Sequence, residues 1–167
     1  MDPLLLLFFP GLMAFAAASD LITMTIPNRL SLALLAGFLA FALISRMPIE
    51  VIGWHFAAGA LVLVITFTMF ACGWIGGGDA KLAAATAVWC GFTSLLEYLL
   101  FASVLGGLLT LAIVYWRTAL MPMSLIRISW IGRLHDNKTG IPYGIALAAS
   151  GLLIYPYTDI WKLATAA

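Results

Sequence analysis

Two acidic residues carry the clearest possibility of chemistry in this sequence. Asp79 follows three consecutive glycines in GWIGGGDAKL, residues 73–82, and Asp20 ends a long apolar run in AAASDLITMTIPN. A carboxylate at a membrane boundary is costly and marks a functional site by default. Two close carboxylates tend to share one proton, so one can take a proton from water while the other polarises a peptide carbonyl. If these side chains meet, their chemistry is that of an aspartic protease.

The glycines before Asp79 support this hypothesis without deciding it. Gly76, Gly77 and Gly78 have no Cβ, so the backbone can turn sharply or approach another segment closely. A tight turn into a helix would leave Asp79 near the helix N-terminus, where the dipole favours a carboxylate. A glycine-rich turn with a helix-capping aspartate is also a common structural feature, since Asp is favoured at such ends. Both interpretations stand at this point.

Composition identifies the environment. Of 167 residues, 64% are hydrophobic and 9% are charged, whereas a soluble domain carries about 25% charged residues. We therefore expect one all-α, polytopic membrane domain over residues 1–167 that contacts the lipid bilayer. The net charge of +1 gives no argument for nucleic acid. No basic residue precedes the first apolar run, which argues against a cleaved signal peptide.

The apolar runs predict about six crossings. Residues 82–116 are too long for one crossing, because about 20 residues suffice, and a turn is expected there at Gly91, Thr93, Ser94 and Glu97. The predicted crossings are residues 4–18, 30–44, 51–72, two within 82–116, and 141–157.

The basic residues orient these crossings. With six crossings, six Lys and Arg residues fall on one side and two on the other, so loops 20–29, 73–81 and 117–140 should face the cytoplasm. Two crossings separate Asp20 from Asp79 and return the chain to the same side, which predicts that the acids lie at one depth. Loop 117–140 either lies flat at the headgroups, with Trp130 as an anchor, or is an ordinary loop.

No metal site or cofactor is expected. Cys72 and Cys90 form no CxxC pair. The two histidines, His55 and His135, fall on opposite sides of the predicted membrane, so they cannot share one metal ion.

Three motifs resemble those of the type IV prepilin peptidases. GGGDAKL matches GxGD and its GDxKL continuation, DLITMTIPN resembles the first-aspartate motif D-x5-IPN, and IPYGIALAASG resembles a final helix with PYG. The short length resembles the branch that serves Flp-type, tight-adherence pili. The resemblance implies a GxGD aspartic endopeptidase, in the bacterial inner membrane, that removes prepilin leaders on the cytoplasmic side.

The resemblance also implies roles for particular residues. Asp20 and Asp79 would be the catalytic pair, and the partners would be a prepilin or pseudopilin and other pilus assembly proteins. The larger members carry zinc-binding CxxC motifs and a methyltransferase activity; this chain has no such cysteines, so we expect neither here. The residues implied to shape the site are Gly76, Gly77, Gly78, Lys81, Pro27, Asn28, Pro142, Tyr143 and Gly144.

Other functions remain open from the sequence. Another GxGD protease, such as a preflagellin peptidase or a presenilin-like enzyme, would use the same acids. A small transporter would place its acids near the bilayer midplane among broken helices, and a silent scaffold of a pilus machine would not use them at all. The predicted boundary position of Asp20 and Asp79 disfavours the transporter.

Overall fold

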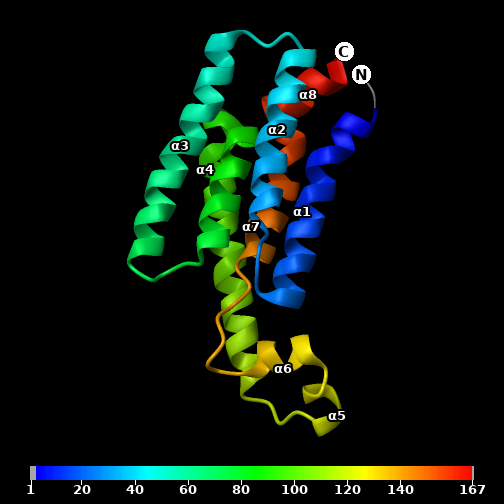
Figure 1. The fold of residues 1–167 in the computed structure, drawn as a ribbon, viewed down its shortest axis with the longest axis vertical. Helices are drawn as coiled ribbons and strands as arrows, with labels where there is room; N and C mark the ends of the chain where they lie inside the picture. Colours follow the sequence, from blue (N-terminus) through cyan, green and yellow to red (C-terminus); the bar gives the residue numbers. More distant parts are fainter. Residues whose placement is uncertain (1–2, 167) are drawn as a thin grey trace.

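The computed structural model describes residues 3–166, which form an all-helical bundle without a strand (Figure 1). This confirms the predicted fold class. The elements are α1 (Pro3–Thr23), α2 (Asn28–Ile44), α3 (Ile49–Ala71), α4 (Gly77–Arg117), α5 (Met123–Ile126), α6 (Ser129–His135), α7 (Gly144–Ile154), the 3-10 turn η1 (Tyr155–Tyr157) and α8 (Asp159–Ala166).

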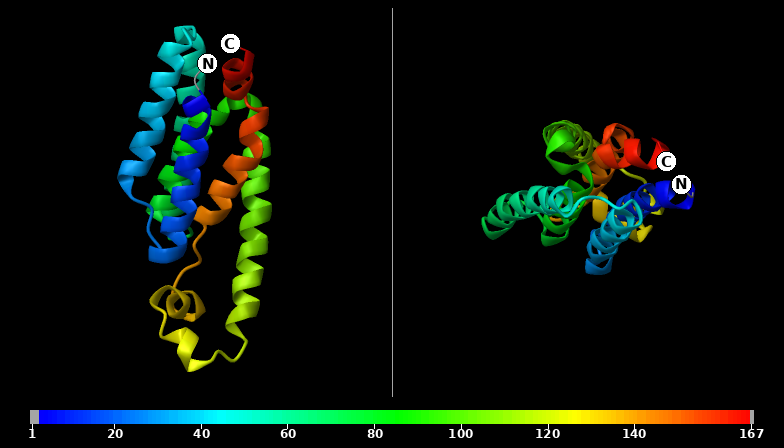
Figure 2. Two further views of the ribbon diagram at one scale, coloured as in Figure 1. Left: turned by 90° about the vertical axis from the view of Figure 1, so that its right-hand side faces the viewer. Right: turned by 90° about the horizontal axis from the view of Figure 1, so that it is seen from above.

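The longest element, α4, is two antiparallel arms. Gly91 interrupts it with φ 61° and ψ 180°, and the chain reverses there, so residues 77–90 and 92–117 run side by side (Figures 1 and 2). The predicted division of residues 82–116 is therefore correct. Its turn is narrower than expected, because Thr93, Ser94 and Glu97 are already helical in the second arm.

Length and apolar composition support membrane crossing for several of these helices. Windows within α1, α3 and α4 are long and apolar enough to span a bilayer, and α2 and Gly144–Tyr157 are shorter apolar helices. Prolines set two of the starts: Pro27 (φ −62°) and Pro48 (φ −57°) immediately precede α2 and α3. The last crossing begins later than predicted, since residues 140–143 are irregular and the helix starts at Gly144.

The loops next to the two acids lie at one end of the bundle. The segments 24–27, 72–76 and 118–143 gather there, whereas the 45–48 loop, the start of α1 and α8 lie at the other end (Figures 1 and 2). This arrangement agrees with the alternation of loops expected from the sequence. Within 118–143, the start of the segment and α5 expose apolar side chains such as Leu120, Met123 and Leu125, and an interfacial position of this segment stays a prediction.

Trp89 anchors the first arm of α4 in the core. Its side chain is 1% exposed, and its ring lies 5.1 Å from Phe9, 6.0 Å from Phe38 and 6.2 Å from Tyr155, centroid to centroid. Its Nε1 donates to the Leu34 carbonyl at 2.9 Å, so the buried indole N–H is satisfied. These contacts tie α1, α2 and η1 to the arm that carries Asp79.

Stability should depend strongly on glycine at position 91. The Gly91 backbone occupies a region open essentially to glycine alone, and a Cβ there would lie 2.8 Å from the His55 ring. We expect Gly91→Ala to lower the free energy of unfolding by about 1–3 kcal/mol, seen as a lower Tm of the purified protein in detergent. Gly53→Ala is the matched control, because a Cβ at Gly53 meets nothing within 4 Å. Equal Tm values for the two variants would contradict the strained reversal.

Candidate active site

Asp20 lies in the last turn of α1, where it is buried. It is 5% exposed, and its Oδ2 accepts a hydrogen bond from the backbone N–H of Gly144 at 2.8 Å. The helix continues to Thr23, beyond the predicted boundary at Ala18, so Asp20 belongs to a regular helix rather than to a loop. This contact joins residues 124 positions apart.

Asp79 is the third residue of α4, and its carboxylate is close enough to Asp20 for the two charges to interact. The backbone amides of Gly76 and Gly144 also act on the Asp79 carboxylate. The contact with Gly76 reproduces half of a capping box, in which an acidic residue at the third helical position faces the N-cap amide. The Gly144 amide therefore lies beside both acids, and the predicted meeting of Asp20 with Asp79 occurs.

The glycines of GGGD allow neighbouring side chains to come close to their backbone. A Cβ on Gly76 would lie 2.9 Å from Asp79 Oδ2, and one on Gly78 would lie 3.2 Å from the Ile26 side chain. Gly77 has its own neighbour, with Phe70 at 3.2 Å from its ideal Cβ. The sharp turn expected from these glycines instead falls at Gly73, whose φ is 75°, whereas Gly76 is extended with φ −73°.

Position 144 also has no room for a Cβ. Its ideal Cβ would lie 2.8 Å from Asp20 Oδ2 and 2.6 Å from Ile26 Cδ1. A side chain at position 144 would therefore push away the carboxylate that its amide now binds. The absence of a Cβ is what allows the amide to reach the acid.

The second arm of α4 fixes the segment that supplies the Gly144 amide. The Tyr143 hydroxyl donates to the Ala102 carbonyl at 3.1 Å, and the ring fills the space beside Gly106, whose ideal Cβ would lie 2.2 Å from it. Arg117 donates to the carbonyls of Leu134 at 2.8 Å and Gly140 at 3.0 Å. Gly106 and Arg117 belong to no local motif, so their part in shaping the site is not visible in the sequence.

A cavity of about 720 Å³ opens beside Asp79. Its wall includes Gly76 and Asp79 but not Asp20, so Asp79 is the acid that meets the cavity directly. Its size lies within the range of ligand-binding pockets, about 300–1,000 Å³. Its other lining residues are Thr66, Met69, Gly73, Trp74, Ile75, Ala83, Leu99, Ala102, Ser103, Thr110, Arg117, Thr139, Gly140, Ile141, Tyr143 and Leu147.

Sequence comparison supplies the family. The family model described as "Type IV leader peptidase family" matches residues 7–111, a range that contains both Asp20 and Asp79. The chain belongs to the type IV leader peptidase family. It is also 28% identical over 151 residues to the "Prepilin leader peptidase/N-methyltransferase" of Bacillus subtilis (strain 168). That alignment covers 90% of this chain and 54% of the relative, so the chain spans about half of the relative's length. No solved structure matches.

Several other residues of the family's motifs lie near Asp20 and Asp79, at the starts of helices. Pro27 occupies the N-cap of α2 and Asn28 is its first residue. Pro142 and Tyr143 directly precede α7. Lys81 does not line the cavity beside Asp79; its Nζ donates to Asn28 Oδ1 at 2.9 Å and joins α4 to α2.

The two histidines lie at opposite ends of the bundle. His55 Nδ1 is 2.7 Å from the Val88 carbonyl, near the reversal of α4, whereas the His135 ring lies 5.3 Å from Trp116 at the other end of the bundle. Over residues 3–166, no three His, Cys, Asp or Glu side chains are grouped closely enough to hold a metal ion.

Gly106 should be required for the position of Tyr143. We expect Gly106→Ala to displace the Tyr143 ring, weaken its bond to Ala102, and lower the free energy of unfolding by about 1–3 kcal/mol through overpacking. The measurement is the Tm in detergent together with proteolytic cleavage of the 139–144 segment, which should become faster. The neighbouring Gly107→Ala is the control, since a Cβ there meets nothing within 4 Å. If both variants resist protease as the wild type does, Tyr143 is not held by this contact.

Proposed function

We propose that the chain is a membrane aspartic endopeptidase that cleaves the leader peptide of type IV prepilins, with Asp20 and Asp79 as the catalytic pair. The observation that carries the proposal is the position of the Gly144 amide: this backbone N–H bonds Asp20 and also acts on Asp79, which lines the cavity. The family and the relative's name, "Prepilin leader peptidase/N-methyltransferase", support the substrate class.

The proposed reaction uses one proton shared by the two acids. The ionised carboxylate takes a proton from a water molecule, whose oxygen attacks the scissile carbonyl carbon. The protonated carboxyl group donates to the carbonyl oxygen and polarises it. The resulting intermediate collapses, the C–N bond breaks, and the leaving amine takes the proton that came from water. The hydroxyl formed from the carbonyl returns its proton to the acid that donated it, which restores the pair. The pair titrates as a unit, since each charge affects the other.

The cavity beside Asp79 is the proposed binding site for the scissile segment. It runs between the end of α3, both arms of α4 and the 139–147 segment, and it offers the polar side chains of Thr66, Ser103 and Thr110. An extended peptide in this cavity would pass Asp79 first. Gly76, Gly77 and Gly78 allow the close approaches of the Asp79 turn, and Pro27, Asn28, Pro142, Tyr143 and Gly144 position the elements around it.

The proposal also covers the membrane in which the protein acts and the type of pilus that it serves. Residues 1–167 would act as one transmembrane peptidase domain in the bacterial inner membrane, with the Asp20 and Asp79 end toward the cytoplasm, serving pili of the Flp type. The 118–143 segment lies at that end (Figure 1), and its basic residues Arg127, Arg133 and Lys138 support this orientation. Other pilus assembly proteins are proposed as further partners.

Cleavage should need both acids. The experiment co-expresses the protein with a prepilin and follows leader removal by the gel shift of the pilin. We expect Asp20→Asn and Asp79→Asn each to lower the cleavage rate by at least about 100-fold, the usual scale for loss of a general acid or base. Each variant should still accumulate in the membrane, because the amide side chain keeps the size of the carboxyl group.

Asp136→Asn is the matched control for this experiment. Asp136 is exposed and accepts from the backbone N–H of Lys138 at 2.9 Å, away from the pair. Its variant should process the prepilin at the wild-type rate. Robust processing by either Asp20→Asn or Asp79→Asn would refute the catalytic pair, and absence of processing by every version, wild type included, would refute the peptidase.

A natural cysteine reports the orientation. Cys72 is exposed in the loop before Gly76, whereas Cys90 is buried. In intact spheroplasts, an impermeant maleimide should leave Cys72 unlabelled, and in inverted membrane vesicles it should label Cys72. Glu50→Cys in a Cys72→Ser background is the opposite control, because Glu50 is exposed at the other end of α3. The reverse labelling pattern would place the acids outside and overturn the orientation.

A further inference from the structure

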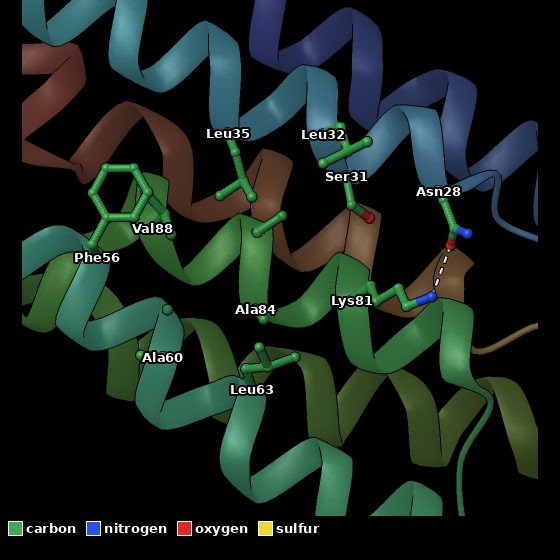
Figure 3. A pocket seen from close by; sticks show the side chains of 12 residues that line it. Asn28, Ser31, Leu32, Leu35, Phe56, Ala60, Leu63, Lys81, Ala84 and Val88 are labelled. Atoms are coloured by element: carbon green, nitrogen blue, oxygen red, sulfur yellow. Dashed lines mark hydrogen bonds between the residues drawn. The ribbon is translucent and has the colours of Figure 1, made fainter.

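A second cavity lies on the other side of the α4 arm that carries Asp79. It is a groove of about 430 Å³ between α2, α3 and residues 81–88 of α4 (Figure 3). Lys81, which lines it, is two residues beyond Asp79 and therefore about 200° further round the helix. A molecule in this groove cannot reach the two carboxylates, so the groove is separate from the proposed peptidase site.

The groove is a wedge that narrows away from Lys81. At its narrow end the Phe38 ring of α2 lies 5.0 Å from His55 and 5.6 Å from Phe56 of α3. Its floor is close-packed, because an ideal Cβ on Gly59 of α3 would lie 3.0 Å from the Ala84 carbonyl oxygen. Helix α3 therefore follows α4, while α2 diverges from α3 toward the Asp20 and Asp79 end (Figure 1).

The walls of the wedge are hydrocarbon. Leu32 and Leu35 of α2 face Phe56 and Leu63 of α3 across the groove, over Ala84 (Figure 3). From Lys81 to Val88 the floor extends about 10 Å along the helix. A flexible apolar chain fits such a narrow wedge, whereas a folded helix, about 10 Å in diameter, requires a wider space than the closed end provides.

The wide end of the wedge is polar and only partly satisfied. Lys81 Nζ bonds Asn28 Oδ1 at 2.9 Å and forms no ion pair with any residue of the described chain. Ser31 also lines the groove, is 8% exposed, and its Oγ has no hydrogen-bond partner within residues 3–166. A buried hydroxyl without a partner is unfavourable, so this Oγ calls for a ligand that accepts a hydrogen bond.

We propose that this groove binds a membrane glycerophospholipid. The phosphate would lie at Lys81 and the amide nitrogen of Asn28, an ester carbonyl would accept from Ser31 Oγ, and one acyl chain would fill the wedge. The three binding features of the groove follow the order of the matching groups in a phospholipid. The phosphate comes first, an ester carbonyl lies about one helical turn deeper, and the hydrocarbon chain follows. The bound lipid would fill the space between α2 and α3 and support the arm that positions Asp79.

The test uses a photoreactive lipid. The full chain is reconstituted into vesicles of phosphatidylethanolamine and phosphatidylglycerol that contain phosphatidylglycerol with a diazirine on one acyl chain. After illumination, the attached peptides are mapped by mass spectrometry. We expect adducts to concentrate on residues 31–35 and 56–63 of α2 and α3, and excess inorganic phosphate should not remove them, since the chain and not the phosphate alone gives the binding.

Matched variants separate this site from general contact with the bilayer. Ala60→Phe fills the groove and should abolish the groove adducts, whereas Ala57→Phe, on an exposed part of α3 that does not line the groove, should leave them unchanged. Lys81→Gln should reduce the preference for phosphatidylglycerol over phosphatidylcholine by about two- to five-fold, as expected for one partly exposed charge. Lys138→Gln is the control for loss of a basic residue.

The outcomes are distinct. Adducts spread evenly over the membrane-facing helices, or equal groove labelling in Ala60→Phe and Ala57→Phe, would overturn the lipid site. If inorganic phosphate removed the adducts, the groove would be a site for anions and not for lipids. If a photoreactive prepilin crosslinked to the same residues in place of lipid, the groove would belong to the substrate. Asp79→Asn should retain the lipid adducts, so this test does not depend on peptidase activity.

Discussion

Two neighbouring carboxylates, one buried (Asp20) and one half-buried (Asp79), repel each other, and the bundle has to offset that repulsion. It does so with a backbone N–H: the Gly144 amide bonds Asp20 and also acts on Asp79, and the Gly76 amide acts on Asp79 from the other side. Backbone donors carry no net charge and no flexible side chain, so they stabilise the acids without neutralising them. Such an arrangement keeps both acids available for proton transfer.

This requirement explains much of the surrounding architecture. At positions 76 and 144 a Cβ would lie within 3 Å of the carboxylate that the amide approaches, and glycine avoids that clash. The segment around Gly144 must then be positioned by contacts other than those with the two acids. Tyr143 bonds Ala102, and Arg117 bonds Gly140, so both join this segment to the second arm of α4. The reversal at Gly91 brings that arm back beside the first, so a strained glycine far from the acids indirectly sets their geometry.

The two faces of the first α4 arm have different chemistry. The Asp79 face meets α1, the 140–144 segment and a cavity with polar groups, and the Lys81 face meets an apolar wedge with one cation and one unsatisfied hydroxyl. A helix places residues two apart on nearly opposite sides, so GDAKL sends its acid and its base to separate environments. The proposed peptidase site and the proposed lipid site thus share one rigid element.

The sequence by itself determined the membrane environment, the helical class, the division of residues 82–116 and the common end of Asp20 and Asp79, because hydropathy and glycine act locally and crossings alternate sides. It also indicated that GGGD serves close approach. It did not determine that the turn lies at Gly73, that α1 continues past Asp20, that the Gly144 amide bonds Asp20, or that Gly106 and Arg117 shape the site. The last three of these features depend on contacts between residues 23 to 124 positions apart. Such contacts are set by how helices pack, and tertiary structure alone decides them.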